Sequence, residues 1–234
     1  MSTASYHNKS LEPGLGATER VHPRRLAERF ATDAAELRAV LAEALIAHVG
    51  FATPDGPVVI PMVHAVVGDD LVLHGAPSSR ALVDGQEVCA TVTLVDALLL
   101  GRSALHHSMR YRCAVVRGRA RRLAGDDARV ALDAFVEHAV PGRTADVRAP
   151  SAAELRRTAV IAVPLAEASL KVRTGFAVDE PEDLDRRCWA GAVPLALLPA
   201  GPAEPDPGLD PAIVVPAAAL ADRRPHHRVE PPCT

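Results

Sequence analysis

The stretch "PVVIPMVHAVVGDDLVLHGA", residues 57–76, contains two apolar, β-branched runs separated by Gly-Asp-Asp. β-branched residues favour strands, while Gly and Asp favour tight turns, so this stretch predicts an antiparallel hairpin. Further strand-type runs are "HVGFAT" at 48–53, "EVCATVTLVDALLLG" at 87–101, "YRCAVVRGRARRLA" at 111–124 and "VIAVPLAEASLKVRTG" at 160–175. Many short strands with turn signals between them predict a mainly β fold, a closed or nearly closed antiparallel barrel.

Three helices are expected outside this barrel. The first begins at Thr32 or Asp33 and continues, by its helical spacing of leucines, to near Gly50. The second covers residues 125–140, because Asp126 or Asp127 can cap its start and Pro141 stops it. The third is short and opens with a capping box formed by Ser151 and Glu154.

The chain has 234 residues, of which 48% are hydrophobic, enough for one sizeable core. Residues 1–20 are expected to be a disordered lead-in, and residues 21–210 a single domain with a C-terminal arm. Eleven of the 20 prolines lie from Pro181 onward, so residues 211–234 are expected to be a loose, Pro-rich tail.

The charge and the cysteine content of the chain argue against several classes of protein and of binding site. The formal net charge is −3, which gives no overall attraction to nucleic acid or to an anionic membrane. No apolar run approaches the roughly 18 residues of a membrane-spanning helix, and the N-terminus has no signal-peptide core, so we expect a cytoplasmic protein. The four cysteines are widely separated, and neither a zinc motif nor a Walker loop occurs, so no metal site is expected.

The segment "HGAPSSR", residues 74–80, follows the second strand of the hairpin and has the residues of an anion site. A helix that begins near Ser78 would offer free backbone N–H groups to an anion. The Arg80 guanidinium would bind the same anion in a bidentate manner, through two hydrogen bonds. Gly75 lets a ligand approach the backbone closely. The alternative is a capped turn beside a solvated arginine, because Ser is a common N-cap.

Two histidines belong to the same hairpin. If Gly-Asp-Asp is a three-residue loop, Val67 pairs with Leu71 and His64 lies directly opposite His74, on one face. Two imidazoles placed like this could ligate a metal or a haem iron, or flank a flavin ring. The alternative is that both are strand histidines whose hydrogen bonds are satisfied within the protein. A loop one residue shorter or longer would place the two side chains on opposite faces of the sheet.

Three segments together resemble the nitroimidazole-resistance branch of the pyridoxamine-5'-phosphate-oxidase-like, flavin-binding split barrels. They are "HSMRYRCAVVRGRARRLAGDDARVAL", "LHGAPSSRAL" and "ASLKVRTGFAVDEPEDLDRRCWAGAVPL", and Cys113 replaces the serine usual in the first. The resemblance covers about residues 20–205 and implies a six-stranded antiparallel split β-barrel with peripheral helices. It also implies a homodimer with sites at the subunit interface.

The resemblance implies FMN as cofactor, with FAD, a deazaflavin or haem as alternatives. The implied cofactor-binding residues are Val59, Ile60, Pro61, Met62, His74, Gly75, Ser79, Arg80, Ser108, Tyr111, Arg112, Lys171 and Arg173. Among them, Ser79 and Arg80 fall on the family's flavin-phosphate positions, and His74 is the candidate catalytic residue. Ala81 follows Arg80 where true pyridoxamine phosphate oxidases have a second basic residue, which argues against pyridoxamine phosphate as substrate.

The expected function is therefore an FMN-dependent oxidoreductase. It would transfer electrons from a reduced nicotinamide through FMN to a small organic substrate, nitro-aromatic compounds among the candidates. Two alternatives remain open. One is a haem-binding split barrel with His74 or His64 as axial ligand, and the other is a flavin-binding module without a substrate of its own.

Overall fold

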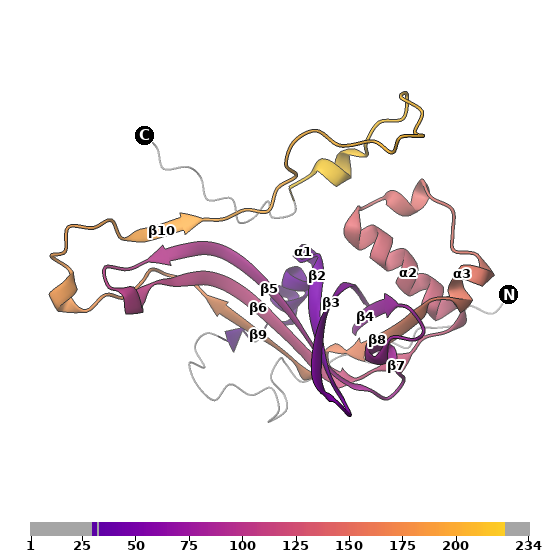
Figure 1. Ribbon diagram of the computed structural model, residues 1–234, viewed down its shortest axis with the longest axis horizontal. Helices are drawn as coiled ribbons and strands as arrows, with labels where there is room; N and C mark the ends of the chain where they lie inside the picture. The colour runs from indigo at the N-terminus through magenta and orange to yellow at the C-terminus, as the bar shows by residue number, and fades with distance from the viewer. Residues whose placement is uncertain (1–29, 32, 223–234) are drawn as a thin grey trace.

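The computed structural model describes residues 30–31 and 33–222, and within them one continuous antiparallel sheet dominates. The strands are β1 (Phe30–Ala31), β2 (Ile46–Thr53), β3 (Gly56–Val67), β4 (Asp70–Gly75), β5 (Glu87–Leu100), β6 (Ser108–Arg119), β7 (Arg121–Arg122), β8 (Ala159–Pro164), β9 (Ala168–Arg173) and β10 (Gly191–Pro194). Their order is β1-β9-β6-β5-β2-β3-β4-β8-β7, and β10 pairs with β5 (Figure 1). The mainly β prediction is confirmed.

The strand number differs from the six expected. In the described part of the chain, the two-residue strands β1 and β7 extend the sheet at its edges, and β10 adds a strand along β5. Such short edge strands have too few residues to give an alternating pattern that sequence reading can detect.

The sheet curls into a half-barrel around its core. At Gly118 of β6, a Cβ atom would lie only 3.2 Å from Val163 Cγ1 of β8, so these two strands approach each other although they are not neighbours in the sheet order. Helix α1 (Ala34–Glu43) packs Leu37, Val40 and Leu41 against the inner face. The interior is therefore filled by side chains, and ligands have to bind on its outside or edges.

Helix α2 (Gly125–Ala139) packs on the other face of the sheet, over β3, β4 and β8 (Figure 1). Ala128, Ala131 and Phe135 form a second core with Ala65 and Val160. The short helix α3 (Ala152–Arg156) begins with the capping box predicted from Ser151 and Glu154, which is confirmed. Both helices lie at the same end of the molecule.

Helix α1 ends at Glu43, earlier than the sequence predicts. Residues 46–53 form β2 instead, paired with β3 on one side and with β5 on the other. The helical spacing of Leu45 and Ile46 is overridden because a strand at this position completes the sheet.

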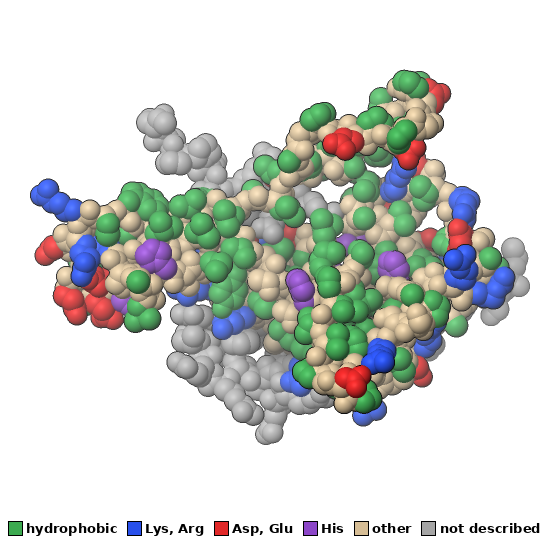
Figure 2. Space-filling model, viewed as in Figure 1, with side chains coloured by type: hydrophobic (Ala, Val, Ile, Leu, Met, Phe, Trp, Pro, Cys, Tyr) green, Lys and Arg blue, Asp and Glu red, His purple; other side chains and the backbone are tan. Residues whose placement is uncertain are grey.

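The hairpin of β5 and β6 extends beyond the half-barrel as an arm, together with β10 and the turn between them (Figure 1). Its side chains include exposed apolar residues: Leu98 is 41% exposed, Met109 47% and Val193 40%. Figure 2 shows hydrophobic side chains gathered along this arm and over the central strands.

The predicted lead-in, residues 1–20, lies outside the described residues. The described part of the predicted tail contains one 3₁₀ helix, η7 (Ala217–Leu220). Its Ala218 lines a small cavity together with Ala42 of α1 and His138 of α2, so this segment contacts the body of the protein.

Candidate functional site

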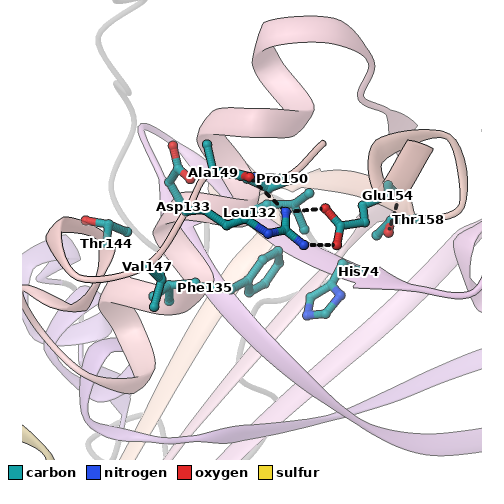
Figure 3. Close-up of a pocket in the computed structure, with 12 residues that line it drawn as sticks. His74, Leu132, Asp133, Phe135, Thr144, Val147, Ala149, Pro150, Glu154 and Thr158 are labelled. Atoms are coloured by element: carbon teal, nitrogen blue, oxygen red, sulfur yellow. Dashed lines mark hydrogen bonds and ion pairs between the residues drawn. The ribbon is translucent and has the colours of Figure 1, made fainter. Parts of the chain in front are cut away.

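A cavity of about 640 Å³ lies beside the end of β4, under helix α2 and the segment that leads to α3. Most of its wall is apolar (Figure 3). The lining residues are His74, Leu132, Asp133, Phe135, Val136, Thr144, Val147, Arg148, Ala149, Pro150, Glu154 and Thr158. This volume is in the range of pockets that hold a cofactor or a drug-sized molecule.

His74 is the titratable group that β4 contributes to this cavity. Its ring lies 4.4 Å from the ring of Phe135, centroid to centroid, with the planes tilted by 55°. Burial lowers the pKa of His74 below its ordinary value, so the imidazole is neutral at pH 7. Among the described residues, no hydrogen bond or ion pair engages its ring nitrogens. The ring can therefore offer a nitrogen lone pair to a ligand in the cavity.

Arg148 and Glu154 form an ion pair at the rim of the cavity (dashed lines in Figure 3). The two N···O distances are 2.7 and 2.6 Å, which is a bidentate arrangement. Glu154 also accepts hydrogen bonds from the N–H and the hydroxyl of Ser151. Arg148 first, and then Ser151, hold the pKa of the Glu154 carboxyl well below its usual range.

The predicted opposition of His64 and His74 is wrong. Val67 pairs with Asp70, so the turn has two residues, and His64 pairs with Leu73. Gly68 has φ +58°, which suits a two-residue hairpin, and Arg38 of α1 donates to its carbonyl oxygen at 2.6 Å. His64 and His74 therefore lie on opposite faces of the sheet.

His64 is fully buried in the core. Its Nε2 lies 3.0 Å from the carbonyl oxygen of Leu41, and its ring lies 4.9 Å from that of His138. His64 is therefore a buried strand residue of the core. His74 remains the histidine of the hairpin that reaches a cavity.

A second feature is the open edge of β3. In the described chain, β2 pairs with residues 56–63 of β3, while β4 pairs only with residues 64–67. Residues 57–63 therefore have no strand on their second edge, and alternate backbone groups there are available to a ligand. The predicted cofactor residues Val59, Ile60, Pro61 and Met62 lie on this edge, and the side chain of Val59 is 64% exposed.

The end of β4 lies beside this open edge. A Cβ atom at Gly75 would lie 3.0 Å from Leu82 Cδ1 and 3.9 Å from Met62 Cε, so only glycine fits without movement. Arg80 Nη1 lies 3.5 Å from Asp55 Oδ2, in the turn between β2 and β3. The structure thus places Gly75 next to Met62, whereas the Arg80 side chain lies beside Asp55.

The predicted helix near Ser78 is only a 3₁₀ turn, η2 (Arg80–Leu82). The N–H of Ser79 donates to the carbonyl oxygen of Ala76 at 2.9 Å, and the Ser79 side chain caps nothing. A strong helix-terminus anion site is therefore absent from these residues. The side chains of Ser79 and Arg80 remain, and that of Arg80 is 68% exposed.

Tyr111, Lys171 and Arg173 lie together on the outward face of the neighbouring strands β6 and β9. Tyr111 pairs with Arg173, the Lys171 ammonium lies 6.0 Å from the centre of the Tyr111 ring, and Arg173 donates a hydrogen bond to the Ser108 hydroxyl. Lys171 and Arg173 therefore share one face of β9.

Arg112 points to the other face of β6, away from this group. Its guanidinium binds Glu43 of α1 at 2.7 and 2.8 Å and Asp96 of β5 at 2.8 and 3.0 Å. Burial opposes its charge, but hydrogen bonds to Asp96 and Glu43 outweigh that and raise the pKa of Arg112 above its usual value. Tyr111 and Arg112 therefore cannot contact the same side of a ring.

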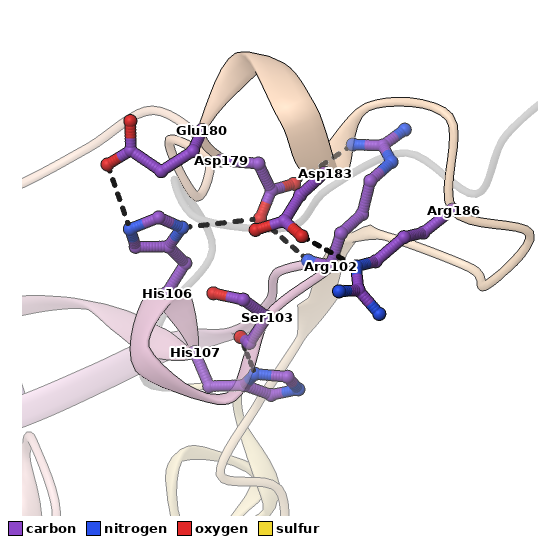
Figure 4. Close-up of polar contacts among 8 residues, drawn as sticks. All are labelled: Arg102, Ser103, His106, His107, Asp179, Glu180, Asp183 and Arg186. Atoms are coloured by element: carbon purple, nitrogen blue, oxygen red, sulfur yellow. Dashed lines mark hydrogen bonds and ion pairs between the residues drawn. The ribbon is translucent and has the colours of Figure 1, made fainter.

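His106 and His107 lie at the tip of the arm (Figure 4). His106 lies between Asp179 and Glu180, 3.6 and 3.7 Å from their carboxylates. Arg102 donates its backbone N–H and its guanidinium to Asp179, at 2.6 and 2.9 Å. These contacts hold the two sides of the arm tip together, away from the cavity of His74.

Several candidate residues were not predicted from the sequence. Phe135 and Arg148 come from segments 60 to 75 residues beyond His74, so no local pattern connects them to it. His48 of β2 pairs with Pro61 and is exposed on the same sheet face as Val59. Its position in the strand was predicted, and only the register shows that it lies beside the open edge.

Two other kinds of feature, a metal-binding cluster and a membrane-spanning helix, are absent from the residues that the structure describes. No group of three or more His, Cys, Asp or Glu side chains is placed to hold a metal ion by itself. No helix of this part of the chain is both long and apolar enough to cross a membrane.

Comparison with known proteins gives one family and several similar structures. The family model described as pyridoxamine 5'-phosphate oxidase matches residues 33–172. The flavocytochrome Anf3 from Azotobacter vinelandii is 33% identical, with a TM-score of 0.78 over 87% of this chain and 96% of that one. No curated protein sequence matches the chain.

Two further structures resemble the chain. The FAD and haem binding protein from Mycobacterium smegmatis is 32% identical, with a TM-score of 0.77 over 83% of this chain and 98% of that one. A candidate 5-nitroimidazole antibiotic resistance protein from Bacteroides thetaiotaomicron is 27% identical, with a TM-score of 0.51 over 61% of this chain and 86% of that one.

Proposed function

Because the chain belongs to the pyridoxamine 5'-phosphate oxidase-like family, we propose that it is a redox protein that binds a flavin nucleotide and haem. The observation that carries the proposal is the cavity of His74, in which a neutral imidazole faces a largely apolar space of about 640 Å³. Two similar structures, at 33% and 32% identity, are a flavocytochrome and an FAD and haem binding protein.

The residues of the cavity fit haem. A neutral imidazole is the usual protein ligand of haem iron, and burial keeps His74 in that state. Phe135 packs against the His74 ring and restricts its orientation. Leu132, Val136 and Val147 supply apolar wall for the porphyrin, and Arg148 supplies a cation at the rim.

The open edge of β3 fits a flavin. Alternate backbone groups of residues 57–63 would hydrogen-bond the ring, while Val59 and Pro61 would contact it from the outward face. The segment from Gly75 to Arg80 lies next to this edge and would hold the phosphate. Both FMN and FAD carry that phosphate, so the residues suit either nucleotide.

The two sites would lie next to each other. If the register of β3 and β4 continues by one residue, His74 lies opposite Val63, on the sheet face that also carries Pro61 and Val59. When bound, the flavin supplies two-electron chemistry with a reduced nicotinamide and the haem supplies one-electron or oxygen chemistry. The protein positions the two groups and shields the imidazole from protonation.

We propose further that the functional unit is a homodimer with the sites at the subunit interface. The outward face of β2 and β3 is apolar and exposed, with Ile46 at 42% and Val63 at 39%. Exposed apolar patches of this kind mark protein contacts, and the apolar arm of β5 and β6 extends the same surface. Tyr111, Lys171 and Arg173 would then face a cofactor held by the partner subunit.

A second candidate is a flavin-dependent oxidoreductase without haem that acts on small organic compounds such as nitro-aromatics. The observation that favours it is the similarity to the candidate nitroimidazole resistance protein, at 27% identity. This function would need the open edge of β3 but not His74 as an iron ligand.

The experiment is to identify the cofactors that the purified protein carries. Mass spectrometry of the extract separates FMN, FAD and haem, and stopped-flow absorbance follows the reduction of each by NADH or NADPH. Flavin and haem in near-equal amounts support the proposal. Flavin alone, with turnover of a nitro-aromatic compound, supports the second candidate, and neither group after reconstitution would overturn both.

A further inference from the structure

Arg148 is the permanent positive charge among the described residues that line the cavity of His74. The other ionisable lining residues are Asp133, Glu154 and His74 itself. Asp133 lies 3.3 Å from Arg129 and is thus engaged on helix α2. The cavity therefore combines one imidazole, a largely apolar wall and one guanidinium at its rim.

Glu154 holds this guanidinium in the structure, but the pair is exposed. The side chain of Arg148 is 72% exposed and that of Glu154 48%. Exposed ion pairs contribute little net stability, so replacing the Glu154 carboxylate by a carboxylate of a ligand costs little. Glu154 would keep its hydrogen bonds from Ser151 after such an exchange.

We infer that Arg148 recognises a carboxylate of the ligand in this cavity, which displaces Glu154 from the guanidinium. The inference rests on the proposed function, and the ligand class is a flat apolar macrocycle with carboxylates at its edge, as haem has in its propionates. The guanidinium fork fits a carboxylate with two parallel hydrogen bonds. His74 and Arg148 would then fix the orientation of the macrocycle at two points.

The test compares haem with haem dimethyl ester, in which both carboxylates are masked. Both are titrated into the parent, Arg148→Gln, Arg148→Lys and Glu154→Gln, and the affinity is read from the absorption of the bound group. The matched control is Arg143→Gln, because Arg143 forms a similar exposed pair with Asp146, at 3.1 Å, and does not line the cavity.

We expect Arg148→Gln to weaken haem binding about ten-fold, the loss of one charge-assisted contact, and to leave binding of the ester unchanged. Arg148→Lys should lose less haem affinity than Arg148→Gln, because lysine keeps the positive charge. Glu154→Gln should bind haem more tightly, and Arg143→Gln should match the parent.

Two outcomes would overturn the inference alone. Equal haem affinity in the parent and in Arg148→Gln would mean that Arg148 does not bind a carboxylate of haem. An equal loss of haem and ester means that Arg148 only shapes the cavity. If the parent binds neither compound, the proposed haem function fails and the inference fails with it. Thermal unfolding of each variant checks that the fold is retained.

Discussion

The rings of His74 and Phe135 lie against each other, with centroids 4.4 Å apart, where strand β4 meets helix α2. One ring comes from the barrel and the other from the helix that covers it, so the cavity exists only when α2 is docked. The site is therefore coupled to the packing of α2, and changes at His74 can be followed through stability as well as through ligand binding.

The free energy of unfolding should depend on pH through His74. Burial lowers its pKa in the folded state, so below pH ~6.5 the unfolded chain binds a proton that the folded chain does not. The parent should lose stability as pH falls from about 7 to 5, and His74→Leu should lack this contribution. Denaturant unfolding across this range measures the difference, and parallel curves for the two proteins would contradict the prediction.

Arg80→Ala should weaken FMN binding by about 10- to 100-fold, because a charge-assisted bond to phosphate contributes roughly 1.5–3 kcal/mol. Riboflavin, which lacks the phosphate, should bind the variant and the parent equally. Ser79→Ala should have a smaller effect. The matched control is Arg119→Ala, since Arg119 is similarly exposed and pairs with Glu87. An equal loss for FMN and riboflavin in a fluorescence titration would show that Arg80 supports only the shape of the site.

Arg112→Leu should destabilise the fold by about 3–5 kcal/mol, because it removes the buried guanidinium that binds the carboxylates of both Glu43 and Asp96. Arg121→Leu is the comparison. Arg121 is 55% exposed and pairs with Asp70, so its loss should cost less than about 1 kcal/mol. Chemical denaturation measures the loss in the free energy of unfolding for both variants. Similar losses would refute the prediction that the buried Arg112 contributes more to stability than the exposed Arg121.

The parent should form a dimer at micromolar concentration, with twice the chain mass of 24.7 kDa in light scattering. Ile46→Glu places a charge on the exposed apolar face of β2 and should shift the protein toward the monomer. A stable monomer of the parent would contradict the shared-site arrangement.

The sequence predicts local features of this protein well. The hairpin at residues 57–76 and the capping box of Ser151 and Glu154 depend on neighbouring residues, and the structure has both. The end of α1 at Glu43 depends on the pairing of β2 with β3 and β5, which helical spacing cannot reveal.

The candidate site depends on the exact strand register and on tertiary contacts. A turn of two residues rather than three separates His64 from His74, and burial in the core gives His64 a different role. The contact of His74 with Phe135 joins residues far apart in the chain, through the docking of α2 on the sheet. Such contacts follow from tertiary packing, so the sequence indicates the histidine but not its cavity.

The central claim is that His74 holds haem in this cavity, and the absorption spectrum of three proteins tests it most directly. The parent, His74→Ala and His64→Ala are each reconstituted with haem and FAD. The parent and His64→Ala should show a Soret band near ~400 nm with flavin absorbance near ~450 nm, whereas His74→Ala should keep the flavin and lose the native Soret band. An unchanged Soret band in His74→Ala would contradict the claim.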